Sequence, residues 1–248
     1  MTQSSRGERL PAANSSPAAP ARSAAGAYWR AVSAVLWKDL AAEFRSKELL
    51  SAMLVFSLLV VLIFNFALQL DRAARENVAA GVLWVTAVFS GTLGLNRSLS
   101  QEKDRGSLDG LLLTPVDRSA IYVGKALGNW LFMLLVQAVI LPVFVVLYNQ
   151  PMLQPLLLVF VVLGTLGYAS VGTLLASMAV HSRARDVMLP ILLLPVAVPV
   201  LVAAVQGSAG VLEQRAWDEI SQWFNLLIGY DVIFLAVAYM AFDYVVEE

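Results

Sequence analysis

The sequence predicts an all-α integral membrane protein, and three observations indicate this fold class. Hydrophobic residues make up 59% of the chain and charged residues only 14%, whereas a soluble domain carries about 25% charged residues. Apolar runs of about 20 residues recur along the chain, and a helix of that length crosses a hydrocarbon core of about 30 Å. Short polar segments separate these runs. We therefore expect a bundle of transmembrane helices.

The composition also excludes several kinds of function. The net charge is −1, which argues against nucleic acid as a partner. The chain has no cysteine, so it forms no disulfide, thiolate metal site or thioether-linked haem. It has one histidine, His181, so a multi-histidine metal site within this chain is impossible. His181 precedes Ser182 and Arg183, and this polar setting favours a solvated loop residue over a haem ligand.

The N-terminal residues differ in composition from the rest of the chain. Residues 1–27 are rich in Ala, Ser, Pro and Arg and have little apolar surface to bury, so we expect a disordered cytoplasmic tail. They lack the continuous apolar core of a signal peptide. Their Arg and Ser content gives a weaker similarity to an organelle transit peptide. We expect residues 28–248 to form the transmembrane domain.

Residues 28–47 predict an amphipathic helix in the membrane interface. Apolar residues recur there every three or four positions, which places them on one helical face, and most charged residues lie elsewhere around the helix. A basic helix with Trp and Phe on its apolar side is typical of the membrane interface. A surface helix packed on soluble protein is the alternative, but the apolar run that follows favours the interface. The expected apolar face consists of Trp29, Val32, Leu36, Leu40 and Phe44.

Six apolar runs are expected to cross the membrane. Small residues in the third and fourth runs permit close contact between helices, notably Gly124 and Gly128 in the third and Gly164, Gly167 and Gly172 in the fourth. Between the fifth and sixth runs we expect a polar loop. The spans are predicted at about residues 49–70, 78–95, 121–148, 155–180, 187–205 and 226–246, and the polar loop at 206–225.

The distribution of Lys and Arg predicts the orientation of these spans. Six spans place both termini on one side of the membrane. Fourteen of the 17 basic residues then lie on that side, and only Arg72, Arg75 and Arg215 lie on the other. Because cytoplasmic loops carry an excess of Lys and Arg, both termini are expected in the cytoplasm.

Residues 101–115 form a charged, amphipathic insert between the second and third spans. The charges from Glu102 to Arg105 cannot lie cheaply in hydrocarbon. Ser107 can cap a short helix with a leucine-rich side, and Thr114-Pro115 ends it because the residue before proline avoids α geometry. Such an insert is a site where another protein can dock.

Few residues within the spans suggest chemistry of their own. The one Gly-Lys pair, Gly124-Lys125, lacks the preceding glycine and following Ser or Thr of a P-loop. Asp231 is a candidate for the transport path, because a charge inside a membrane is a functional hypothesis by default. We favour the alternative that Asp231 lies near the periplasmic interface or caps the sixth span.

Three prolines, Pro190, Pro195 and Pro199, interrupt the fifth span. We expect a kinked or partly unwound helix there. This segment could form a hinge or expose carbonyl groups toward a substrate path. A simple packing kink explains the same pattern equally well.

The insert and its surroundings resemble the permeases of ABC-2 type exporters, and within them the haem exporter protein B family, the cytochrome c maturation permease. The pattern Gly106-Ser107-Leu108-Asp109 followed by Leu111 to Pro115 carries the broad resemblance, although glutamate is commoner than aspartate at the position of Asp109. The narrower resemblance lies in Gly81-Val82-Leu83-Trp84-Val85 and in the proline-broken segment from Leu189 to Pro199. The similarity runs from about Leu36 to the sixth span.

This resemblance implies a membrane subunit without its own ATPase motif, in a bacterial inner membrane. Two permease copies would pair with two copies of a separate ABC ATPase and with further membrane subunits of cytochrome c maturation. The complex would export haem or release a haem-loaded periplasmic chaperone; ATP would bind the partner subunit, and this chain would carry no cofactor of its own. The residues expected to couple to the ATPase are Glu102, Asp104, Arg105, Gly106, Ser107, Leu108, Asp109, Leu111, Leu112 and Pro115.

Three alternatives remain open on the sequence alone. The chain could be the permease of another ABC-2 exporter, for example of a lipid, drug or polysaccharide. It could be a membrane scaffold that anchors an ATPase without transport. A secondary transporter is the weakest alternative, because the spans lack the embedded charges that couple ions.

Overall fold

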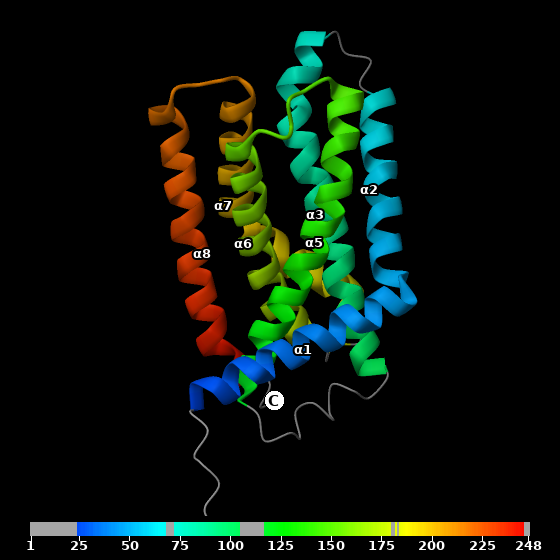
Figure 1. Ribbon diagram of the computed structural model, residues 1–248, viewed down its shortest axis with the longest axis vertical. Coiled ribbons are helices and arrows are strands. Elements are labelled where there is room, and N and C mark those ends of the chain that lie inside the picture. The colour runs from blue at the N-terminus through cyan, green and yellow to red at the C-terminus, as the bar shows by residue number, and fades with distance from the viewer. Residues whose placement is uncertain (1–23, 68–71, 105–116, 180–181, 183, 246–248) are drawn as a thin grey trace, which may run out of the picture.

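The computed structural model describes residues 24–67, 72–104, 117–179, 182 and 184–245, and every regular element within these residues is a helix. A helix near the N-terminus is followed by six long apolar helices (Figure 1). The helices are α1 (Ala24–Ser46), α2 (Glu48–Ala67), α3 (Arg72–Asp104), α5 (Arg118–Tyr148), α6 (Pro155–Ala179), α7 (Arg185–Leu212) and α8 (Trp217–Val245).

Six of these helices are long and apolar enough to cross a membrane, which confirms the predicted fold class and identifies a multi-pass membrane protein. Each contains an 18-residue window with a mean hydropathy of 1.8 or more, and their lengths fit the thickness of a hydrocarbon core. The candidate spans are Glu48–Ala67, Val78–Ser98, Arg118–Tyr148, Pro155–Ala179, Val187–Leu212 and Trp217–Ala241.

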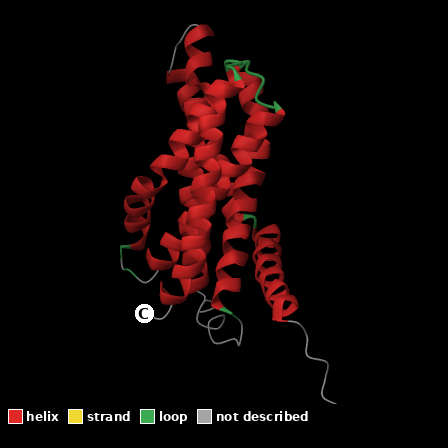
Figure 2. Cartoon of the chain, turned by 90° about the vertical axis from the view of Figure 1, so that its left-hand side faces the viewer, coloured by secondary structure: helices red, strands yellow, loops and turns green. Residues whose placement is uncertain are grey.

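The six long helices alternate in direction and form an elongated bundle. Figure 1 shows the start of α2, the end of α3, the start of α5 and the end of α8 at one end of this bundle. The helix α1 crosses that same end obliquely, whereas the six other helices run along the bundle axis; Figure 2 shows α1 leaning against the bundle from outside. The bundle therefore has one end that carries α1 and an opposite end that carries the α5–α6 and α7–α8 loops.

The helices α3 and α6 lie at the centre of the bundle. In the most apolar 18-residue stretch of each of these two helices, 67% of the residues are buried. The corresponding share is 22% for α2 and α8, which lie at the periphery. Glycines on α6 explain its central position, because they let bulky side chains of α3 approach its backbone: a Cβ at Gly164 would clash with Trp84, and one at Gly172 with Leu95. The predicted close packing of the fourth span is confirmed.

The polar loop expected between the fifth and sixth spans is mostly helical. The helix α7 continues to Leu212 and α8 begins at Trp217, so only residues 213–216 connect them. The polar residues there extend the two helices beyond their apolar parts. Asp218 and Glu219 occupy the first turn of α8, where negative charge interacts favourably with the helix dipole. Polarity alone therefore gave the wrong boundary for these two spans.

The three prolines of the fifth span do not unwind it. Pro190, Pro195 and Pro199 all lie inside α7, which is helical from Arg185 to Leu212. Of the two expectations, a kinked or a partly unwound helix, the unwound segment was wrong, and the kink stays a prediction. Neighbouring helices can support a proline-containing transmembrane helix by packing and by satisfying the backbone groups that proline frees. Here α7 packs against α3, α6 and α8.

Candidate functional sites

The predicted coupling segment is bracketed by two helices that end at the same end of the bundle. The side chains of Glu102 and Asp104 and all residues from Arg105 to Pro115 lie outside what the structure describes. The helix α3 carries the backbone as far as Asp104. Asp117 then caps α5, because its carboxylate accepts hydrogen bonds from the backbone nitrogen of Ser119 at 3.0 Å and from the Ser119 hydroxyl at 2.6 Å.

A buried ion pair joins α1 to the first turns of α5. The Lys125 ammonium lies 2.8 Å from Asp39 Oδ2, and the two side chains are 4% and 11% exposed. Gly124 lets the helices approach, because a Cβ there would lie 2.8 Å from Val35 Cβ. Gly128, one turn further, faces Asp39 as well. The expected Gly124-xxx-Gly128 contact surface therefore exists, and its partner is α1.

A second buried carboxylate fixes the turn between α1 and α2. Glu43 is 5% exposed, and its Oε1 accepts a hydrogen bond of 2.8 Å from the backbone nitrogen of Leu50 in the first turn of α2. The chain bends sharply at Lys47, whose φ of 56° is left-handed, and continues into α2 (Figure 1). Both acidic residues of α1, Asp39 and Glu43, are thus directed into the protein and paired. This end of the bundle is a joint in which α1, α2 and α5 are held together.

Asp231 lies at the centre of the membrane-spanning bundle. The helix α8 begins at Trp217, so Asp231 is about 21 Å along its axis at 1.5 Å per residue. Its side chain is 4% exposed and faces Gly167 of α6, where a Cβ would clash with Oδ1. The expectation that Asp231 caps the span or lies at the interface was wrong, because it assumed that the sixth span begins near Leu226.

The carboxylate of Asp231 has no hydrogen-bond partner among the described residues, for either oxygen. Most buried carboxylates are paired, because burying an unpaired charge costs far more than burying a neutral group. The nearby hydroxyl of Tyr230 does not serve it, since it donates to the carbonyl oxygen of Val196 at 3.0 Å. Asp231 is therefore a buried acid whose carboxylate oxygens accept no hydrogen bond from the described residues in this conformation.

The proline-containing helix meets Asp231 at this site. Val200, next to Pro199 on α7, lies beside Gly167 together with Asp231 and Tyr230. Tyr230 binds a carbonyl of the α7 turn between Pro195 and Pro199. The sequence suggested Pro199 and Asp231 separately as candidates for a path or hinge, and the structure brings the two helices that carry them into contact at one level of the bundle.

Several other buried polar side chains in the bundle are paired across helices. Trp84 Nε1 donates to Ser208 Oγ at 3.0 Å, between α3 and α7. The hydroxyls of Thr92 and Tyr168 lie 2.6 Å apart, between α3 and α6. Asn129 of α5 donates to Thr173 Oγ1 of α6 at 3.0 Å. Buried oxygens of Ser57, Asn65 and Gln137 lack a hydrogen-bond partner as well, but among the described residues with such oxygens Asp231 is the acid.

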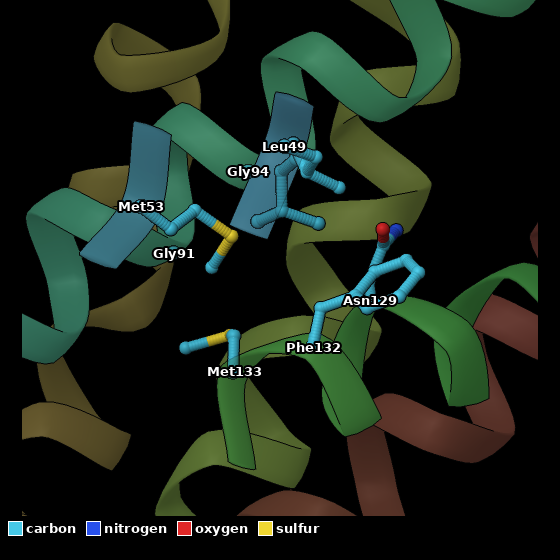
Figure 3. Close-up of a pocket in the computed structure, with 8 residues that line it drawn as sticks. Leu49, Met53, Gly91, Gly94, Asn129, Phe132 and Met133 are labelled. Carbon is cyan, nitrogen blue, oxygen red and sulfur yellow. The ribbon is translucent and has the colours of Figure 1, made fainter. Parts of the chain in front are cut away.

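A narrow gap between α2, α3 and α5 leaves no room for a water molecule, so it does not provide a path for a large substrate (Figure 3). Met53 and Met133 extend over Gly91 and Gly94 and fill it, since a Cβ on either glycine would lie less than 3 Å from a methionine atom. Its lining is Leu49, Met53, Gly91, Gly94, Leu95, Asn129, Phe132 and Met133.

No group of three or more potential metal ligands occurs within the described residues. His181 lies outside them, so its expected position in a solvated loop stays a prediction. The pairing of Asp39 with Lys125 was not predicted, because Lys125 was interpreted as part of a failed nucleotide-binding motif and as one of the basic residues on the cytoplasmic side. A lysine inside a predicted span was the available signal, since such a charge requires a partner.

The geometry defines a class: a polytopic helical membrane protein with an oblique N-terminal helix clamped to the bundle and a charged segment between its second and third spans. The family model of the CcmB protein matches residues 30–248. The chain therefore belongs to the CcmB protein family, as its sequence motifs indicated.

Individual relatives agree with this family assignment. The heme exporter protein B of Rhodobacter capsulatus is 32% identical over 170 residues, which cover 68% of this chain and 78% of that protein. Its counterpart in Paracoccus denitrificans is 32% identical over 182 residues, covering 71% and 84%. The Pseudomonas aeruginosa protein of the same name is 27% identical over 180 residues, covering 71% and 81%.

Proposed function

We propose that this chain is the permease subunit of an ABC transporter complex for cytochrome c maturation. In this complex a separate subunit hydrolyses ATP, and the energy drives haem export or release of a haem-loaded periplasmic chaperone. The observation that carries the proposal is the match of residues 30–248 to the CcmB family, together with relatives named heme exporter protein B. The six candidate spans support a transport role.

The proposal places the chain in a bacterial inner membrane with both termini in the cytoplasm. The excess of Lys and Arg toward one side supports this orientation. The end of the bundle that carries α1 would then be cytoplasmic, and the α7–α8 loop would be periplasmic. Residues 1–27 would form a cytoplasmic tail and residues 28–248 the permease domain.

Residues 101–115 would dock the ATPase subunit. The end of α3 and the capped start of α5 flank this segment, so its movement would act directly on both helices. The buried ion pair between Lys125 and Asp39 ties α5 to α1, and Glu43 ties α1 to α2. A displacement of the docked segment would therefore reach the spans through the joint as a rigid-body movement.

The contact region of α6, α7 and α8 around Asp231 would serve as a hinge or as part of the transport path. A carboxylate with no partner in one conformation can gain a partner in another, and α7 contributes Pro190, Pro195 and Pro199, which lack backbone hydrogen-bond donors. The contact of α8 with α6 at Gly167 would then differ between two states of the transporter. Haem is the substrate in this proposal and not a cofactor held by this chain.

The complex would contain two copies of this permease, the ATPase and other membrane subunits of cytochrome c maturation. ATP would bind the partner subunit, since this sequence has no P-loop. The exposed apolar side chains of α2 and α8, such as Phe66 and Met240, are available for lipid or for neighbouring subunits.

A detergent pull-down tests the proposal. The full chain is purified with residues 101–115 intact or scrambled, and co-purifying proteins are identified. We expect an ATPase and haem-handling membrane proteins with the intact chain and their loss with the scrambled one. An ATPase without haem-handling proteins would contradict the cytochrome c assignment, and no ATPase would contradict the coupling role.

A pair of substitutions sharpens this test. Glu102→Lys with Asp109→Lys reverses two charges in the segment while leaving the spans unchanged. We expect weaker co-purification of the ATPase with normal membrane insertion. Unchanged co-purification would exclude these two acids as docking residues. Arg215→Gln, at the opposite end of the bundle, is the control.

A further inference from the structure

The exposed surface of α1 combines large aromatic side chains with basic ones and carries no exposed acid. Trp29, Trp37 and Phe44 are 62%, 72% and 61% exposed. Each is followed directly by an exposed basic residue, which gives the pairs Trp29-Arg30, Trp37-Lys38 and Phe44-Arg45. We name the three aromatic side chains the aromatic stripe of α1 and Arg30, Lys38 and Arg45 its basic stripe.

Helical geometry separates the two stripes and orders them around α1. At roughly 100° per residue, the aromatic stripe falls within an arc of about 80° and the basic stripe within the adjoining arc of about 80°. The residues that pack on the bundle, including buried Val32, Val35 and Glu43, occupy a third arc of about 80°, which adjoins both stripes on the remaining side of the helix. The bundle, the aromatic stripe and the basic stripe therefore divide the circumference of α1 among them.

This order differs from the single apolar face that the sequence predicted. Val32 faces the bundle, whereas Trp29 and Phe44 are exposed, so the five predicted residues divide between two environments. An exposed helix surface that carries aromatic rings on one side and cations on the other is typical of a lipid interface. In a bilayer, the aromatic rings would lie near the acyl–headgroup boundary and the cations near the phosphates.

The charge on this surface results from how α1 packs. Its two acids, Asp39 and Glu43, are turned into the protein, where Lys125 and the backbone nitrogen of Leu50 bind them. Had they been exposed, they would have offset much of the charge of the basic stripe. Lys38 of the basic stripe also lies 3.4 Å from Asp39 Oδ1, so this carboxylate partly offsets its charge. The exposed charged side chains of α1 itself are all positive.

We propose that the aromatic and basic stripes of α1 form a binding surface for anionic phospholipid headgroups. Charge complementarity and the position of the aromatic stripe beside the lipid-facing bundle favour this occupant over a protein. The identification of the leaflet as cytoplasmic rests on the proposed orientation; the preference for anionic over zwitterionic lipid does not. Each basic residue near a membrane surface is expected to change binding by about five-fold.

Tryptophan quenching in vesicles tests this proposal on the full chain. The protein is reconstituted in phosphatidylcholine with a small, equal fraction of dibrominated phosphatidylcholine or dibrominated phosphatidylglycerol. The signal of Trp29 and Trp37 is the difference from a Trp29→Phe/Trp37→Phe variant, because the chain has six tryptophans. We expect stronger quenching by the brominated phosphatidylglycerol, and a smaller difference at high salt, which screens exposed charges.

Neutralising variants identify the residues responsible. Glutamine has a helix propensity close to those of Arg and Lys, so it preserves α1. Arg45→Gln is expected to lower the preference for phosphatidylglycerol about five-fold, and Arg30→Gln/Lys38→Gln/Arg45→Gln to abolish it. Arg215→Gln, in the loop at the opposite end of the bundle, should leave the preference unchanged.

Three outcomes would overturn the inference. Equal quenching by the two lipids would show that α1 does not select headgroups, and an unchanged preference in the triple variant would exclude the basic stripe. Loss of quenching when the ATPase and other membrane subunits are added would show that a protein covers the aromatic stripe. ATPase co-purification, measured on the same variants, reports the proposed transport function separately, so either proposal can fail alone.

Discussion

Two regions of the molecule differ in whether their buried acidic side chains have a binding partner: the joint between α1 and α5, and the part of the bundle around Asp231. At the joint, Asp39 is paired with Lys125, and Glu43 binds a backbone nitrogen. Midway along α8, Asp231 is 4% exposed and both its oxygens lack a partner in the described structure. Satisfied charges favour one arrangement of the helices, whereas an unsatisfied one leaves free energy that another arrangement can recover. On this comparison we propose that the first region is a fixed link and that the second region changes conformation.

The largest expected effect is from breaking the buried pair at the joint. Lys125→Met keeps the length of the side chain but leaves Asp39 buried with Lys38, 3.4 Å away, as its remaining cation. Removing one partner of a buried ion pair typically costs about 3–5 kcal/mol, so we expect the free energy of unfolding to fall by about 3 kcal/mol. A titration with sodium dodecyl sulfate in mixed micelles measures it.

Lys38→Met is the matched control, because Lys38 is 42% exposed and contacts the same carboxylate. It should cost less than about 1 kcal/mol, as exposed ion pairs do. Equal losses in the two variants would mean that the joint is not held by the buried pair. ATP-driven transport should fall in Lys125→Met even at temperatures where the protein stays folded.

The same substitution at the two acids should have effects of opposite sign. Asp39→Asn removes a charge that is paired and should lower the free energy of unfolding by about 1–3 kcal/mol. Asp231→Asn removes a charge that has no partner, and we expect stability to be unchanged or to rise by up to about 1–3 kcal/mol. Unfolding measurements on the two single variants in one detergent give the comparison.

Activity should separate these two variants further. If the carboxylate of Asp231 gains a partner in a second conformation, Asp231→Asn should lower transport or haem release while the protein becomes no less stable. Such a trade between stability and activity is common where function needs an unsatisfied group. Loss of stability in Asp231→Asn would show instead that Asp231 has a structural partner, and the contrast with Asp39 would disappear.

Packing around the central helix offers a third test. Gly172 of α6 faces Leu95, so Gly172→Ala should cost about 1–3 kcal/mol through overpacking, and Gly172→Leu more. Gly81 of α3 is the control, because a Cβ there meets nothing within 4 Å. Gly81→Ala should be neutral or stabilise by up to about 1 kcal/mol, since alanine favours the helix. Normal assembly of the Gly172→Leu variant would contradict this prediction, because it would mean that α6 can shift to make room. Equal free energies of unfolding for Gly172→Ala and Gly81→Ala would lead to the same conclusion.

Long-range patterns in the sequence predicted the fold, because six apolar runs leave few arrangements in a bilayer. The end of α7 and the start of α8 were misplaced, since polar residues such as Asp218 and Glu219 are compatible with helix beyond the hydrocarbon as well as with a loop. The partner of Lys125 and the surroundings of Asp231 depend on which helices meet, and one sequence does not contain that information. Gly124 and Gly128 showed where a helix would pack on α5, but not that the helix is α1.

The smallest expected effect concerns an exposed ion pair that connects two helices at the same end of the bundle. Arg97 of α3 lies 3.1 Å from Glu48 of α2, with side chains 39% and 52% exposed. Because solvent screens it, Arg97→Gln should change the free energy of unfolding by less than about 1 kcal/mol. Double-mutant cycles over Arg97–Glu48 and Lys125–Asp39 measure both coupling energies in one assay. At a salt concentration of about 1 M the Debye length is about 3 Å. This salt should abolish the coupling energy of Arg97–Glu48 and leave most of the coupling energy of Lys125–Asp39. A salt-sensitive coupling between Lys125 and Asp39 would mean that water enters the joint, and the contrast with Asp231 would then reflect accessibility and not pairing.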